Sequence, residues 1–145
     1  MLELEGVNPD TGILSAYYGV EIDIDKDSRG DLLVWGLGEG STEWNISNMY
    51  VMSDDNNDVG ATRPMRADAP TSGLDGYERV ILSPTQFSDP DAGWKRVDPA
   101  DSTIVQIAVK KSVMNNASAF MWSAWADDGQ KDAALFDYND KFTLS

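Results

Sequence analysis

The segment "ILSAYYGVEIDIDKDSRGDLLVWGL", residues 13–37, carries the strongest fold signal in the chain. Its first half alternates apolar and acidic residues, with Val20, Ile22 and Ile24 on one face and Glu21, Asp23 and Asp25 on the other. A period of two residues is typical of a β-strand. A second apolar run, "DLLVWGL" (31–37), follows a glycine. The segment therefore predicts two strands that are joined by an acidic connection.

Further short apolar runs follow at irregular intervals, and the stretches between them are rich in Gly, Pro, Asp and Asn. The runs are "NMYVMS" (48–53), "YERVILS" (77–83), "TIVQIAVKK" (103–111), "SAFMWSAWA" (118–126) and "KFTLS" (141–145). This pattern predicts one all-β domain over residues 1–145, an antiparallel β-sandwich of jelly-roll or Ig-like type with about seven or eight strands and long acidic loops. The run 141–145 is either a last strand or a point at which a longer protein has been cut.

The composition limits the chemistry that this chain can perform. The chain has 145 residues, a formal net charge of -14 and neither cysteine nor histidine. Disulfides, zinc–thiolate sites and cysteine nucleophiles are thereby excluded, and the ligands that remain are oxygens, which suit Ca²⁺, Mg²⁺ or Mn²⁺. Because so acidic a chain repels phosphate backbones and anionic membranes, we expect no nucleic-acid partner and no membrane insertion.

The acidic connection has the spacing of a calcium loop. With Asp23 at position 1, Asp25 and Asp27 occupy positions 3 and 5, the Arg29 carbonyl position 7, and Asp31 position 9. Successive carboxylates on one strand face lie about 6.5–7 Å apart and repel each other, and a hard cation converts this repulsion into binding.

This loop resembles the DxDxDG-type calcium loop of EF-hands, dockerin-like modules and many extracellular β-domains. It departs from the EF-hand because Gly30 falls at position 8 and Val34 stands at position 12. A calcium-binding hairpin loop therefore fits better, in which Gly30 permits the sharp return of the chain. The alternative is a solvated polar edge strand without an ion.

A second stretch, "SDDNNDVG" (53–60), repeats the spacing with Asp54, Asn56 and Asp58 after another expected strand. Its alternative is an ordinary turn, since Asp and Asn are common turn residues. The two loops could also hold one ion jointly.

The pattern "DIDKDSRGD…STEWNI…DDNNDVG…WKRVDP…WSAWADDG…FDYND" is similar to an uncharacterised type of bacterial exported β-domain. This resemblance implies a secreted or cell-surface location and brings no known activity. The Arg29–Gly30–Asp31 tripeptide matches a cell-adhesion motif, but a turn plus a metal ligand explains it better.

The sequence leaves several functions open. We expect a calcium-stabilised extracellular or cell-surface binding or structural module, with no catalytic residues and with carbohydrate or another surface protein as partner. One alternative is a carbohydrate-binding module that uses Trp44 and Trp94, which lie in loop-like segments, whereas Trp35 and Trp122 are expected in the core. A carboxylate-based enzyme acting on polysaccharide and an acidic decoy for a nucleic-acid-binding protein are further alternatives, but no acid–nucleophile pair stands out among the carboxylates.

Overall fold

The computed structural model describes residues 2–5, 17–27, 29–37, 41–56, 77–127, 137–138 and 143–144. The hairpin expected around the acidic loop is present in it. Strand β2 (Tyr17–Asp23) pairs antiparallel with β3 (Leu32–Leu37), with Val20 opposite Val34 and Ile22 opposite Leu32. Strand β2 ends at Asp23, so Asp25 and Asp27 belong to the connecting loop.

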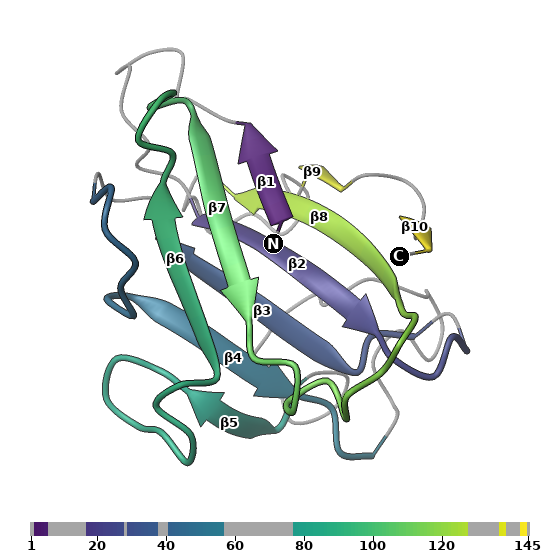
Figure 1. Cartoon of the computed structure of the whole chain (residues 1–145). Helices are drawn as coiled ribbons and strands as arrows, with labels where there is room; N and C mark the ends of the chain where they lie inside the picture. Colours follow the sequence, from purple (N-terminus) through teal and green to yellow (C-terminus); the bar gives the residue numbers. More distant parts are fainter. Residues whose placement is uncertain are drawn as a thin grey trace.

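Two antiparallel sheets face each other (Figure 1). The large sheet has the order β10-β8-β2-β3-β4-β5, with β9 paired to β8, and the small sheet has the order β1-β7-β6. The other strands of the large sheet are β4 (Met49–Ser53), β5 (Arg79–Leu82), β8 (Met121–Asp127), β9 (Asp137–Tyr138) and β10 (Thr143–Leu144). Those of the small sheet are β1 (Leu2–Glu5), β6 (Gly93–Val97) and β7 (Ile104–Val109).

The predicted all-β sandwich is confirmed, and the described residues contain no helix. It follows that no helix in this part of the chain is long and apolar enough to span a membrane. Each of the apolar runs overlaps a strand, and β8 lies inside the large sheet, between β2 and β10. Three strands were not predicted, namely β1, β6 and β9. Strand β6 was missed because its sequence, "GWKRV", contains two cations and stands between turn-rich stretches.

The core lies between the sheets and is built from alternate residues of each strand. Val20 and Ile22 of β2, with Val34 of β3, pack toward Val105 and Ile107 of β7. Strand β6 approaches the large sheet closely at Gly93, where a Cβ atom would lie 3.1 Å from a Val51 methyl carbon. Burying these apolar side chains supplies the main driving force for folding.

The other face of the large sheet is also buried along β2. Glu21 and Asp23 have 0% of their surface exposed, and the flanking Leu33 and Ser123 have 1% each. Because β2 lies between β3 and β8, it is not an edge strand, and the alternative of a solvated polar edge is wrong for this strand. Two carboxylates are therefore held inside the protein at neighbouring positions of one strand face.

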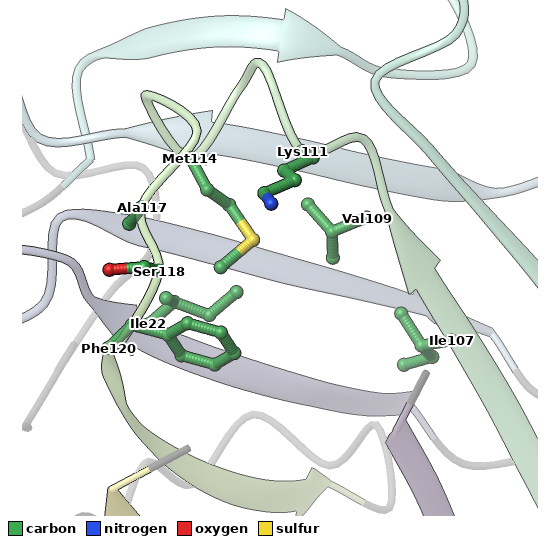
Figure 2. Close-up of a pocket in the computed structure, with 8 residues that line it drawn as sticks. All are labelled: Ile22, Ile107, Val109, Lys111, Met114, Ala117, Ser118 and Phe120. Carbon is green, nitrogen blue, oxygen red and sulfur yellow. The ribbon is translucent and has the colours of Figure 1, made fainter.

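One end of the core opens into an apolar pocket of about 430 Å³ (Figure 2). Ile22 and Ile107 line it from the two sheets, and the side chain of Met114, from the connection between β7 and β8, points toward Ile22 and Phe120. Lys111 and Ser118 are its polar residues. The sequence did not predict this pocket, because its walls come from both sheets.

Candidate metal centre

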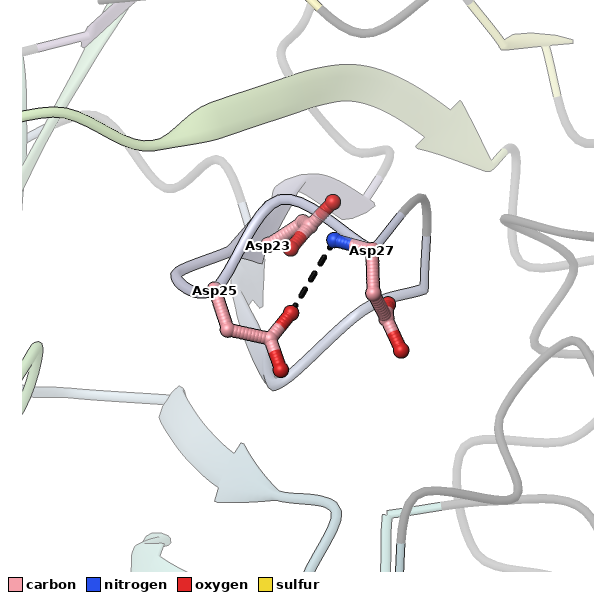
Figure 3. Close-up of side chains that lie close together, drawn as sticks. All are labelled: Asp23, Asp25 and Asp27. Carbon is pink, nitrogen blue, oxygen red and sulfur yellow. Dashed lines mark hydrogen bonds between the residues drawn. The ribbon is translucent and has the colours of Figure 1, made fainter.

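Three aspartates, one at the end of β2 and two in the β2–β3 loop, come together. One carboxylate oxygen from each of Asp23, Asp25 and Asp27 lies within 4.8 Å of the other two, so the group could hold a metal ion. Asp23 is buried at the end of β2, whereas Asp25 and Asp27 are exposed on the loop (Figure 3). The two-residue spacing that predicted a calcium loop therefore does bring three of the predicted ligands into one cluster.

Backbone N–H groups of the loop hold these carboxylates in place. Oδ1 of Asp23 accepts a hydrogen bond from the Lys26 N–H at 2.6 Å, and Oδ1 of Asp25 accepts one from the Asp27 N–H at 3.0 Å (Figure 3). Oδ1 of Asp27 accepts one from the Arg29 N–H at 2.8 Å. The bonds of Asp25 and Asp27 reach the backbone two residues on and are Asx turns, whereas that of Asp23 spans three residues. Lys26 has a φ of 66°, a left-handed conformation that completes the bend.

Asp31 closes the loop from its far end. Its Oδ2 accepts hydrogen bonds from the backbone N–H groups of Ile24 and of Asp25, the latter at 3.3 Å. Burial raises the pKa of Asp31, these two hydrogen bonds lower it, and the charges of Asp25 and Asp27 raise it again. The negative charges of Asp25, Asp27 and Asp31 therefore repel each other, and a bound cation would reduce this repulsion. The direct role of Asp31 as a metal ligand stays a prediction.

Arg29 contacts the cluster in a way that the sequence did not predict. Besides its N–H bond to Asp27, its Nε atom lies 4.0 Å from Oδ2 of the same residue. A guanidinium group at this distance partly neutralises Asp27. The Arg29 carbonyl as a metal ligand stays a prediction.

The second acidic stretch lies beside the first. The Asp54 N–H donates to the Asp31 carbonyl oxygen at 3.0 Å, and Ser53 pairs with Leu32. The Asn56 N–H donates to Oδ1 of Asp54 at 3.0 Å, which is an ordinary Asx turn. Asp58 lies outside the described residues. One ion shared by the two loops would require them to be adjacent, as they are. The shared ion itself stays a prediction.

Beneath the loop, Glu21 is hydrogen-bonded to Tyr77. The Tyr77 hydroxyl donates to Oε1 of Glu21 at 3.0 Å, and both side chains are buried. Among the described residues, Oε2 of Glu21 is buried and has no hydrogen-bond partner. Burial raises the pKa of Glu21 to about 7, although the hydrogen bond from Tyr77 lowers it in part. Sequence reasoning missed this pair, and the only available signal was the position of Glu21 two residues before Asp23.

The raised pKa of Glu21 predicts a stability that falls with pH. The folded state holds the proton more tightly, so stability is highest below about pH 4.5, the ordinary pKa, and is lost as the pH rises through about 7. The difference between these two pKa values corresponds to roughly 3 kcal/mol. We expect Glu21→Gln, which keeps the Tyr77 hydrogen bond, to be neutral at pH 4 and stabilising by about 1–3 kcal/mol at pH 8.

Urea unfolding of both proteins in a metal chelator, at pH 4, 6 and 8, measures this difference. The chelator is needed because a cation near Asp23 would also stabilise the ionised Glu21. A difference between variant and wild type that stays constant from pH 4 to pH 8 would contradict the assignment.

The two tryptophans that were predicted to bind ligand also come together, although they lie far apart in the sequence. Trp44 and Trp94 line a shallow pocket of about 340 Å³ together with Ala108. The expected loop position is correct for Trp44 but wrong for Trp94, which lies in β6. Of the two tryptophans expected in the core, Trp122 packs against the core cluster, while Trp35 stacks on Tyr50 with ring centroids 4.0 Å apart.

Comparisons with known proteins found no match among family models, curated proteins or solved structures. The fold and the site therefore define the protein only as an all-β sandwich with a cluster of three aspartates that could hold a metal ion.

Proposed function

We propose that this protein is a calcium-stabilised binding or structural module without catalytic activity, and that it acts outside the cell or on its surface. The observation that supports it is the Asp23–Asp25–Asp27 cluster at the end of a central strand. An ion there ties the end of β2 to the following loop, and so stabilises the hairpin from which the large sheet is built.

The geometry favours calcium over smaller ions. Ligands of one Ca²⁺ lie about 2.3–2.6 Å from the ion, so two of them are separated by at most about 5 Å. The three carboxylate oxygens, all within 4.8 Å of each other, satisfy this limit before any movement. Mg²⁺ holds its ligands at about 2.0–2.1 Å in a strict octahedron, so two of its ligands are separated by at most about 4.2 Å, which is a tighter limit than that of calcium. Backbone carbonyls and water can complete the calcium shell.

The extracellular location is part of the proposal for a related reason. A loop with two exposed carboxylates, one of them already paired with Arg29, is suited to a weak site. Extracellular calcium modules work with dissociation constants of about 10⁻⁴–10⁻³ M, whereas the cytosol requires much tighter sites.

Thermal melting tests the proposal most directly. We expect Ca²⁺ to raise the melting temperature of chelator-treated protein in a saturable way, and Mg²⁺ at the same concentration to raise it much less. A hundredfold excess over the dissociation constant corresponds to about 2.7 kcal/mol of added stability. Equal curves in Ca²⁺ and in chelator would exclude the site, and equal shifts by both ions would exclude calcium selectivity.

A carbohydrate-binding role is the second candidate. It is favoured by the common pocket of Trp44 and Trp94, since tryptophans that share one exposed pocket can stack on the C–H faces of sugar rings. This role is compatible with the first, because the pocket is formed by the small sheet and the metal cluster by the large one.

A further inference from the structure

The segment 41–47 lies along the free edge of the small sheet. The Asn45 N–H donates to the Lys95 carbonyl at 3.0 Å, and the Lys95 N–H donates back to the Asn45 carbonyl at 2.9 Å. The Val97 N–H also donates to the Ser41 carbonyl at 2.8 Å. The segment therefore continues the sheet beyond β6 and orders the side chains that it carries.

This pairing places two apolar side chains beside β6 on the outer face of the sheet. Gly93, Lys95 and Val97 of β6 are buried toward the core, so Trp94 and Arg96 point outward. Trp44 lies under the guanidinium group of Arg96 and lines one pocket with Trp94, and Ile46 is exposed on the other side of Asn45. We call this surface, formed by Trp44, Ile46, Trp94 and Arg96, the tryptophan face.

The tryptophan face contains large apolar side chains that the fold leaves exposed to solvent. Trp44 is 38% exposed and Ile46 is 40% exposed, and they are two of the three large exposed apolar side chains among the described residues. The third is Phe87, at 61%, in the connection between β5 and β6. Contiguous exposed apolar groups with a polar rim are typical of binding sites.

A chain of polar contacts holds Arg96 against Trp44. The guanidinium carbon of Arg96 lies 4.6 Å from the centroid of the Trp44 ring. Nε of Arg96 donates to Oε1 of Gln106 at 2.6 Å, and Nε2 of Gln106 donates to Oδ2 of Asp98 at 2.6 Å. The aromatic ring and the cation are therefore fixed before any ligand arrives, which lowers the entropy cost of binding.

The N–H donors of Arg96 indicate which ligand groups this surface can bind. Within the described part of the chain, Nε of Arg96 has a hydrogen-bond acceptor, and no acceptor contacts its two terminal nitrogens. These nitrogens carry N–H groups at the rim of an aromatic surface, where they can donate to hydroxyl oxygens. The net charge of -14 disfavours a polyanion.

We propose that the tryptophan face binds a neutral polysaccharide, with Trp44 and Trp94 stacking on sugar rings and Arg96 donating to sugar hydroxyls. This inference rests on the proposed function and deepens it, because it names the ligand class of the binding module. Large aromatic and arginine side chains in a fixed arrangement are the ones that dominate binding energies.

Affinity electrophoresis of the full chain tests the inference, with gels that contain hydroxyethyl cellulose, xylan, glycogen or polygalacturonate. We expect at least one neutral polysaccharide to retard the wild type, and Trp44→Ala and Trp94→Ala each to weaken binding tenfold or more. Arg96→Gln is expected to weaken binding several-fold. Phe87→Ala removes a more exposed aromatic side chain outside this face and is expected to bind as the wild type does.

Several outcomes would overturn the inference. These are an absence of retardation in every neutral gel, retardation that neither tryptophan variant reduces, and retardation by polygalacturonate alone. Self-association of the wild type that Trp44→Ala abolishes, seen by sedimentation, would assign the face to a second copy of the chain instead. Trp44 lies outside the core, so Trp44→Ala decides the question even if Trp94→Ala does not fold.

Running the gels in Ca²⁺ and in chelator separates this inference from the calcium proposal. Retardation that depends on Trp44 supports the inference under either condition. A melting temperature that does not change with Ca²⁺ would exclude the metal site but would leave the polysaccharide inference standing.

Discussion

Replacing Asp25 and Asp27 together by asparagine is expected to abolish most of the calcium-dependent stabilisation. Asparagine keeps the Oδ1 acceptors that bond to the N–H groups of Asp27 and Arg29, so the loop retains its turns. It removes two of the three charges in the cluster. If affinity falls about a hundredfold, a stabilisation of about 2.7 kcal/mol falls to about 0.4 kcal/mol at the same Ca²⁺ concentration.

The same variant should behave differently in chelator, and this difference identifies the mechanism. Because Asp25 and Asp27 raise the pKa of Asp31 through their charges, removing them relieves repulsion. We therefore expect the metal-free variant to be as stable as metal-free wild type, or more stable by up to about 1 kcal/mol. Calcium titration calorimetry and urea unfolding, each with and without Ca²⁺, measure the two effects.

Asp91→Asn is the matched control for these substitutions. Asp91 is exposed, lies outside the cluster and loses one negative charge on substitution, as each of Asp25 and Asp27 does. It should leave the calcium response unchanged. A response that Asp91→Asn reduces as much as the double variant does would mean that general charge, and not a site, is responsible.

Replacing Gly30 by alanine is expected to destabilise the protein by about 3 kcal/mol or more, the upper range for overpacking of a buried site. The added methyl group would overlap the Tyr77 hydroxyl and lie 3.2 Å from its ring carbon Cζ. Tyr77 is 1% exposed and its hydroxyl is bonded to Glu21, so it has little freedom to move. The sequence suggested that Gly30 permits a sharp return, but its φ is not left-handed, and the close approach of Tyr77 is what requires glycine.

A double-mutant cycle with Tyr77→Phe tests this explanation. Tyr77→Phe alone removes the donor to Glu21 and should cost about 1–3 kcal/mol. Because it also removes the oxygen that the new methyl group would meet, the double variant should be less destabilised than the sum of the two single changes, by about 1–2 kcal/mol. Urea unfolding in chelator gives all four free energies. Strict additivity would show that alanine at position 30 acts through its backbone alone.

The order of residues within one short segment was enough to determine the β2–β3 hairpin and its loop. The alternation of Val20 and Ile22 with Glu21 and Asp23 predicted a strand, and the structure confirms it. The two-residue spacing of the aspartates predicted a cluster, and Asp23, Asp25 and Asp27 form one. Both features depend on backbone geometry within a few residues, which the order of side chains already specifies.

Only the tertiary structure decided what surrounds these local features. Tyr77 reaches Glu21 across 56 residues of chain, and Asn45 pairs with Lys95 across 50. Strand β6 exists because it pairs with β7 and packs on β4, although its own sequence contains two cations. Contacts of this kind are set by how two sheets bury their faces against each other, and a periodicity within one strand carries no information about its partner.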